Sequence, residues 1–384
     1  MLYAVSSFYE RRDEMNTLER MHEIDVLRGF ACLGLAFANI VPLSTPVLYD
    51  SIPSSLWTTQ IDRLVEQLLY IFVHGNFYPL FSMLFGFSFM LFMDKAAAKG
   101  KNPHILFTRR QVVLLCIGAV HAFFIWYGDI LIVYALFGFL LLPLYKASRK
   151  TISILLVLIL LPNILILFLL IDIPYDPAEY FDYYYLLRVI ENYQAGGTSA
   201  FLQNYYDWLT SYQSLSILFL FINIFPMFLI GVLLAKSKSI ILHITKKHVV
   251  FWLLFGVLGV FIKISAVFHP NSLLFLQASD VIGNPLMSLF YGLSILLFMH
   301  ITKNSLIFIR YVGRMAITNY LMQNIIGLII FRLFHLYGIL PPSRLIIISL
   351  AVAVCQIGLS YLWLQRFKQG PIEIMWRKLT YFKI

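Results

Sequence analysis

Apolar runs about twenty residues long recur along this sequence of 384 residues and limit its fold more than any other feature. An α-helix needs a run of about that length to cross the hydrocarbon core of a bilayer. Hydrophobic residues form 60% of the chain and charged residues only 12%, whereas ordinary soluble domains carry about 25% charged residues. The sequence therefore predicts an all-α, polytopic integral membrane helical bundle.

Charged and turn residues divide the apolar sequence into ten expected transmembrane helices. Their approximate spans are residues 24–47, 64–93, 109–127, 129–146, 151–171, 213–235, 247–268, 281–301, 315–337 and 342–364. The expected regions follow in chain order. They are an N-terminal segment (1–23), a five-helix bundle (24–171), a Tyr- and Asp-rich segment (172–212), a second five-helix bundle (213–364) and a basic tail (365–384).

Lysine and arginine residues are distributed unevenly between the two ends of these helices. The segments on the side of the N-terminus hold 24 of the 29, and the opposite side holds three, Arg63, Arg188 and Arg344. Because positively charged loops stay in the cytoplasm, we expect both termini to be cytoplasmic in a multi-pass protein of the cell (cytoplasmic) membrane. The net charge of +10 then reflects topology, with attraction to the anionic lipid bilayer as a secondary effect.

The segment 172–212 lies on the opposite, extracytoplasmic side in this topology. It holds six carboxylates and nine of the 23 tyrosines. Tyr and Trp favour the membrane interface, so the segment is either an amphipathic connector in that zone or a lid over an outward-facing pocket. Aromatic rings and carboxylates together suit a sugar or another polyhydroxylated ligand.

The first expected helix, "HEIDVLRGFACLGLAFANI", carries charged and amide groups that are costly in hydrocarbon. At 100° per residue, Asp25, Arg28 and Asn39 share one face with Cys32 and Ala36. Asp25 and Arg28 can form an ion pair at the cytoplasmic end. The face either anchors the helix and bonds a neighbour, or it forms one wall of a cavity.

A break is expected in the second run at "VHGNFYPLF", because Gly75, Asn76 and Pro79 interrupt the helical pattern. Residues 64–73 then form an interfacial or re-entrant piece and residues 77–93 form the span. His74 lies at this break and is either a packing residue or a residue that faces a cavity.

Further polar groups enter the third, fourth and ninth helices. In "HAFFIWYGDILIVYALFGFLLLP", Asp129 either caps the fourth helix or points back to His121. In "GRMAITNYLMQNIIG", four polar side chains indicate that the helix lines a polar interior, and these are Thr318, Asn319, Gln323 and Asn324. By depth, Asn39, His74, His121 and Asp129 fall in the outer half, and four arginines gather at the cytoplasmic edge, namely Arg28, Arg109, Arg110 and Arg314.

The cysteines, Cys32, Cys116 and Cys355, all lie in apolar runs without metal-ligand spacing, so they are interpreted as core residues. The sequence contains no Walker, Rossmann or haem-attachment motif and no nucleic-acid-binding module. We therefore expect no metal, no bound cofactor and no nucleic-acid partner. The oligomeric state stays open between a monomer and a homodimer.

Several quoted stretches resemble one bacterial membrane family, the YeiB-like family (domain of unknown function 418), whose named domain corresponds to about residues 225–384. They are "IDVLRGFACLGLAFANI", "FYPLFSMLFGFSF", "HAFFIWYGDILIVYALFGFLLLP", "FPMFLIGVLLAK", "GRMAITNYLMQNIIG" and "LQRFKQGPIEIMWRKLTY". The first helices also resemble transmembrane acyltransferases typified by heparan-alpha-glucosaminide N-acetyltransferase, through the Asp-x-x-Arg-Gly opening and the following membrane Asn. That resemblance implies transfer of acetyl from cytoplasmic acetyl-CoA to a sugar amine beyond the membrane, with a histidine taking part.

Two functions are compatible with these features. The first is an acyltransferase that moves an acyl group from a cytoplasmic acyl-CoA to an extracytoplasmic sugar, lipid or envelope acceptor. Its expected catalytic residues, assigned by depth, are His121, His74, Asn39 and Asp129, and its expected substrate-binding residues are Asp25, Arg28, Arg314, Asn319, Gln323 and Asn324. The second is a transporter or exporter of a small polar or anionic solute through the same polar interior.

Overall fold

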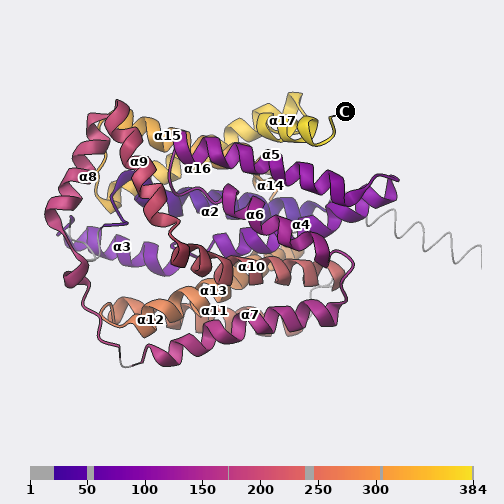
Figure 1. The fold of residues 1–384 in the computed structure, drawn as a ribbon, viewed down its shortest axis with the longest axis horizontal. Helices are drawn as coiled ribbons and strands as arrows, with labels where there is room; N and C mark the ends of the chain where they lie inside the picture. Colours follow the sequence, from indigo (N-terminus) through magenta and orange to yellow (C-terminus); the bar gives the residue numbers. More distant parts are fainter. Residues whose placement is uncertain (1–20, 50–55, 172, 238–245, 303–305, 383–384) are drawn as a thin grey trace, which may run out of the picture.

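The computed structural model describes residues 21–49, 56–171, 173–237, 246–302 and 306–382, and these form an all-α bundle without a β-strand (Figure 1). Within these ranges, nine helices are long and apolar enough to cross a membrane. They are α2 (His22–Ser44), α4 (Tyr78–Ala98), α5 (Pro103–Phe124), α7 (Arg149–Leu169), α10 (Ser214–Ser237), α11 (Lys246–Phe268), the rod Leu273–Thr302, the rod Ala316–Leu333 and α16 (Pro342–Arg366). The predicted all-α, polytopic membrane fold is confirmed.

Two of these rods contain a π-helical turn. The first rod comprises α12 (Leu273–Ala278), the π-helical turn η3 (Ser279–Gly283) and α13 (Asn284–Thr302). The second comprises α15 (Ala316–Leu328) and the π-helical turn η4 (Ile329–Leu333), and it follows the short helix α14 (Ile307–Arg314). Single π-turns inside helices often accompany functional sites.

The expected fourth span, 129–146, is shorter in the structure than predicted. It consists of α6 (Leu131–Leu141) and the 3₁₀ turn η1 (Leu142–Leu144). The turn before it ends at Asp129, which caps the new helix through the backbone N–H of Ile132, and Pro143 lies in the 3₁₀ turn that ends it. The apolar run is therefore longer than the helix itself, because its first and last residues belong to turns.

The second expected run is broken, as predicted. The amphipathic helix α3 (Gln60–Phe72) ends before the break, and α4 starts at Tyr78. Between them Gly75 adopts a φ of +74°, which favours glycine.

The segment 172–212 contains the 3₁₀ turn η2 (Pro177–Tyr180) and two helices, α8 (Tyr183–Ala195) and α9 (Gly197–Ser211). Figure 1 shows α8 at the end of the bundle away from the C-terminal helix α17 (Pro371–Thr380). The two ends of the bundle are therefore covered by different short helices.

Helix α2 lies at the centre of the arrangement and packs against α4, α14, α15 and α16. Its contact with α14 is very close, because a Cβ atom at Gly29 would lie 2.0 Å from the Ile309 carbonyl oxygen. A Cβ atom at Gly313 would lie 1.7 Å from the carbonyl oxygen of Asp25. Small residues allow membrane helices to approach in this way, and here they fix α2 beside α14.

Candidate functional site

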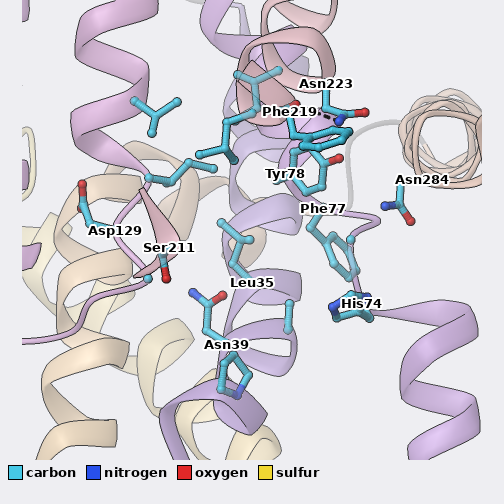
Figure 2. Close-up of a pocket in the computed structure, with 18 of the residues that line it drawn as sticks. Leu35, Asn39, His74, Phe77, Tyr78, Asp129, Ser211, Phe219, Asn223 and Asn284 are labelled. Atoms are coloured by element: carbon cyan, nitrogen blue, oxygen red, sulfur yellow. Dashed lines mark hydrogen bonds between the residues drawn. The ribbon is translucent and has the colours of Figure 1, made fainter. Parts of the chain in front are cut away.

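A cavity of about 550 Å³ lies between α2, the α3–α4 break, the start of α6, α9, α10, η3 and α15. Its walls carry two carboxylates, Asp129 and Asp280, and no Lys or Arg side chain. We call it the acidic cavity. Figure 2 shows Asn39 between Asp129 on one side and His74 and Asn284 on the other.

Asp129 and His121 form a buried pair behind one wall of this cavity. The Asp129 Oδ1 atom lies 2.8 Å from His121 Nδ1, and Asp129 Oδ2 accepts a hydrogen bond of 2.7 Å from the Ile132 backbone N–H. Asp129 therefore has both roles that the sequence left as alternatives. The turn at Tyr127–Asp129 brings the carboxylate to the imidazole because it reverses the chain directly above α5.

The other ring nitrogen of His121 is also occupied. Asn324 Nδ2 lies 2.9 Å from His121 Nε2, and the His121 side chain has no exposed surface. An amide N–H can only donate, so this contact assigns Nε2 as an acceptor and Nδ1 as the donor to Asp129. His121 does not reach the cavity in this structure. It contacts Asp129, and Asp129 is the member of the pair that belongs to the cavity wall, although its side chain has no exposed surface either.

The remaining residues of the expected catalytic set line the acidic cavity. Asn39 lies on α2, and His74 lies at the α3–α4 break with its ring stacked on Tyr70 at a centroid distance of 5.6 Å. Tyr320 also lines the wall, with its ring centroid 5.2 Å from that of His121. Its buried hydroxyl has no hydrogen-bond partner among the described residues. Sequence reasoning missed Tyr320, although it lies between the polar residues singled out on the same helix.

A second cavity of about 460 Å³ lies at the other end of α2 and has the opposite charge. One carboxylate, Glu373, lines it together with six basic side chains, Arg28, Lys95, Lys99, Arg110, Arg314 and Arg377. We call it the basic cavity. The guanidinium carbon of Arg110 lies 3.5 Å from the Trp376 ring centroid and 5.2 Å from that of Phe92, so the basic cavity combines cations with aromatic faces.

Arg28 lines the basic cavity and is held from behind. Its Nη1 atom lies 3.2 Å from Asp25 Oδ1, and its Nη2 atom donates to Ser88. Asp25 is buried and does not line the cavity itself. The structure thus brings Arg28, Arg110 and Arg314 together, whereas Arg109 is directed to the carbonyl oxygen of Phe382 instead.

The C-terminal helix α17 closes one side of the basic cavity and caps α15 through Glu373. Glu373 Oε1 accepts hydrogen bonds from the backbone N–H groups of Ile317 at 2.8 Å and Thr318 at 3.2 Å, and Oε2 accepts one from Thr318 Oγ1 at 2.6 Å. These donors are free at the start of any helix. Burial raises the pKa of Glu373 above its ordinary value, which hydrogen bonds from Thr318 oppose.

A void of about 20 Å³ lies between the two cavities, and we call it the neck. Four of its residues also line the acidic cavity, namely Leu35, Tyr78, Ile130 and Tyr320. The other four also line the basic cavity, namely Phe81, Leu131, Tyr134 and Ile317. The two cavities therefore meet end to end at a constriction of uncharged residues.

Two residues expected at the substrate site lie elsewhere. Asn319 Nδ2 donates to Ser360 at 2.9 Å and to the Val312 carbonyl at 3.2 Å. Gln323 contacts Gln356 of α16 at 3.5 Å. Both residues are buried against polar side chains of α16, and neither lines either cavity. They bond a neighbouring helix, and only Asn324 faces the His121 site.

The segment 172–212 contributes directly to the acidic cavity through Ser211 and Tyr212. The Tyr212 hydroxyl donates to the carbonyl oxygen of Asp129. Asn204 of α9 accepts from the Tyr127 N–H at 2.9 Å and donates to the Ala122 carbonyl at 2.8 Å. Helix α9 is therefore fixed to the turn that carries Asp129.

Among the described residues, no group of three His, Cys, Asp or Glu side chains is placed to hold a metal ion. The basic cavity is the part of the described structure whose chemistry suits phosphate groups, because arginine guanidinium groups bind phosphate in a bidentate manner. Phosphate-bearing ligands are therefore a class that this end of the bundle suits.

Comparisons with known proteins give a family assignment. A family model described as "Protein of unknown function (DUF418)" matches residues 234–383. The chain is 33% identical over 398 residues to the uncharacterized protein YxaH of Bacillus subtilis, with 95% of each chain covered. It is 27% identical over 407 residues to the uncharacterized protein YeiB of Escherichia coli, with 94% of this chain and 97% of YeiB covered. The chain therefore belongs to the YeiB-like DUF418 family, as its sequence motifs predict.

Proposed function

We propose that this protein is an acyltransferase of the cell membrane, which moves an acyl group from cytoplasmic acyl-CoA to an extracytoplasmic acceptor. The acceptor is a sugar, lipid or envelope component with a free hydroxyl or amino group. The observation that supports this proposal best is the opposite charge of the two cavities on either side of the neck.

The basic cavity is the proposed donor site. Its six basic side chains match the phosphate groups of coenzyme A. Contacts with Asp25 and Ser88 hold the guanidinium group of Arg28 in place. The lysines and arginines that predict the cytoplasmic side lie at this end of α2. A CoA ester would therefore bind from the compartment in which it is made.

The neck is the proposed place where the acyl group passes. Its lining is uncharged and includes the side chains of Leu35, Phe81 and Ile317. An acyl chain can enter such a constriction, whereas the charged phosphates of the donor would remain behind. The thioester carbonyl would then lie between the donor cavity and the acceptor cavity.

Asp129 is the proposed general base on the acceptor side. It lines the acidic cavity next to Ile130, which also lines the neck. The acceptor hydroxyl gives its proton to Asp129 as its oxygen attacks the thioester carbonyl, the C–S bond breaks, and the CoA thiolate takes up a proton as it leaves. His121 keeps the carboxylate oriented, and the side chains of Asn39 and Tyr320 are suited to donate hydrogen bonds to the developing oxyanion.

A transporter of a small polar solute is the second candidate, and the break between α3 and α4 favours it, since discontinuous helices often form solute sites. An anionic solute would have to leave six basic side chains for a cavity whose charged groups are carboxylates. Charge therefore disfavours export of an anion along this route.

A transfer assay in membrane vesicles separates the two functions. Vesicles with the cytoplasmic face outward would be supplied with acetyl-CoA that carries a radiolabel in the acetyl group. The proposal predicts saturable transfer of label to lipid or glycan, lost in Asp129→Asn and kept in Glu191→Gln, an exposed carboxylate of α8. Labelled product that is independent of Asp129 would contradict the assigned base, and no labelled product with any acyl-CoA would reject the transferase.

A further inference from the structure

A lysine side chain is fully buried in the membrane helix α11. Lys263 has no exposed surface, and its Nζ atom donates to the His74 carbonyl at 2.9 Å and to Asn284 Oδ1 at 2.7 Å. The ammonium also lies 4.5 Å from the Tyr70 ring centroid. An ionisable group inside a membrane protein is expensive and commonly marks a functional site.

The contacts of Lys263 are part of a larger support for the α3–α4 break. Three backbone carbonyls at or next to the break accept hydrogen bonds from side chains of other helices. Tyr291 donates to the Phe72 carbonyl at 2.6 Å, Lys263 to that of His74, and Ser288 to that of Asn76 at 2.5 Å. Irregular backbone at membrane depth persists only where such partners exist. The conformation of the break is therefore stabilised by side chains of α11 and α13.

Asn284 connects this support to a carboxylate in the cavity wall. Its Nδ2 atom donates to Asp280 Oδ1 at 3.1 Å, while its Oδ1 atom accepts from Lys263. The break approaches Asn284 so closely that a Cβ atom at Gly75 would lie 2.3 Å from Asn284 Nδ2. Asp280, Asn284 and His74 all line the acidic cavity, and Figure 2 shows His74 and Asn284 on the side away from Asp129.

We propose that this wall is a subsite for an uncharged, polyhydroxylated group such as a sugar ring, which Asp280 and His74 bind through its hydroxyls. The identification of that ring as part of the acyl acceptor rests on the proposed function. Lys263 acts from behind, because it fixes Asn284, which in turn donates to Asp280.

Charge and size support this class of ligand. An anion would face the two carboxylates of the cavity, and the buried ammonium of Lys263 disfavours a cation at the wall in front of it. Hydroxyls that donate to a carboxylate make strong, charge-assisted hydrogen bonds. The cavity, at about 550 Å³, is within the range of small-molecule sites, about 300–1,000 Å³. Phe77 and Tyr78 add ring faces beside the polar groups.

The subsite is tested by binding without any transfer reaction. The full chain would be placed in nanodiscs, so that no sugar-headed detergent competes, and saturation-transfer NMR would measure binding of glucose and glucuronate. We expect saturable glucose binding, at least about tenfold tighter than that of glucuronate, which carries one carboxylate on the same ring. Asp280→Asn should weaken glucose binding about tenfold, and Glu191→Gln should not change it.

His74→Gln is the second variant, because Asp280→Asn disturbs the hydrogen bonds that run from Lys263 through Asn284 to Asp280 and can lower stability. It should also weaken glucose binding, with a melting temperature near that of the wild type. The inference is overturned by equal affinity for glucose and glucuronate, by no saturable glucose binding, or by full affinity in a folded Asp280→Asn or His74→Gln protein. Acyl-CoA binding on the same samples separates the two proposals. Glucose binding without acyl-CoA binding would reject only the transferase, and acyl transfer without glucose binding would reject only the subsite.

Discussion

Asp129 stands between His121 and the acidic cavity, with its Oδ1 atom 2.8 Å from the imidazole Nδ1, and Asp129 is the member of the pair that belongs to the cavity wall. In the proposed mechanism a ligand therefore meets Asp129 first, and the histidine acts through it. The alternative order is one in which the imidazole reacts and the carboxylate orients it. The variants of these two residues separate the two orders.

Replacement of Asp129 by asparagine should abolish acyl transfer while the protein still folds. Asparagine caps a helix nearly as well as aspartate, so the start of α6 should persist. Loss of the general base should lower the transfer rate by about 10²–10⁴-fold. The vesicle assay would be read together with the melting temperature, and substantial activity in a stable Asp129→Asn protein would contradict the assignment.

The two amide replacements of His121 should differ from each other. In His121→Asn the amide lies near the former Nδ1 and can still donate to Asp129, whereas in His121→Gln it lies near the former Nε2 and bonds Asn324 instead. If His121 positions Asp129, the asparagine variant should keep the larger share of the transfer rate. An imidazole that itself takes part in proton transfer would leave both variants equally inactive, and His74→Gln, measured alongside, would show whether the cavity-facing imidazole is needed.

Arg28→Lys should fold but bind CoA more weakly. Lysine lacks the planar guanidinium that bonds Asp25 and Ser88 and that, in the proposed donor site, would also bind a phosphate group. We expect about a tenfold loss of affinity, or about 1.4 kcal/mol, by equilibrium binding to protein in nanodiscs. Lys150→Gln, an exposed lysine at the start of α7, is the control. Unchanged CoA affinity in Arg28→Lys would leave Arg28 only the role of anchoring α2.

Glu373→Gln should remove part of the pH dependence of stability. Burial raises the pKa of this carboxyl in the folded protein above its ordinary value of 4.5. The folded state therefore binds the proton more tightly than the unfolded state. The contribution of Glu373 to stability is therefore complete below about pH 4.5 and is lost as the pH rises through the raised pKa.

A glutamine at position 373 cannot ionise, and its side-chain oxygen can still accept from the N–H groups of Ile317 and Thr318. Melting temperatures from pH 4 to pH 8 should therefore fall less steeply in the variant than in the wild type. Parallel curves would show that the carboxyl is not titrated over this range.

Reporter fusions test the predicted topology. A fusion near Gly196, between α8 and α9, should report the extracytoplasmic side, and fusions within 94–110, within 146–150 and at the C-terminus should report the cytoplasm. A cytoplasmic signal at Gly196 would reverse the orientation and with it the assignment of the basic cavity to the donor.

The sequence predicted those features that depend on local pattern. The break at residues 73–77 was visible because glycine and proline interrupt a helix, and the Asp25–Arg28 pair because residues three apart share a helix face. The proximity of Asp129 to His121 followed from a turn too short to separate them. The shortened fourth helix was not visible, because apolar turn residues read as helix.

Features that depend on neighbours distant in sequence could not be predicted. The polar side chains of Asn319 and Gln323 indicated that each needs a hydrogen-bond partner. The sequence does not show whether that partner lies on a packed neighbouring helix or in a cavity. The sequence does not show that Lys263 bonds the His74 carbonyl, because the two residues are 189 positions apart. Glu373 looked like part of a basic tail, although it caps a helix that begins about 55 residues earlier.

The uncharged neck has an electrical consequence. A void of about 20 Å³ has room for about one water molecule, so it interrupts the aqueous path between the two cavities. In the proposed reaction the acceptor gives up a proton on one side of the neck and the CoA thiolate takes one up on the other, so each transfer moves one elementary charge across the membrane. That movement costs about 2.3 kcal/mol against a potential of 100 mV. A potential that is negative on the cytoplasmic side opposes it, so transfer should be slower in energised than in depolarised vesicles.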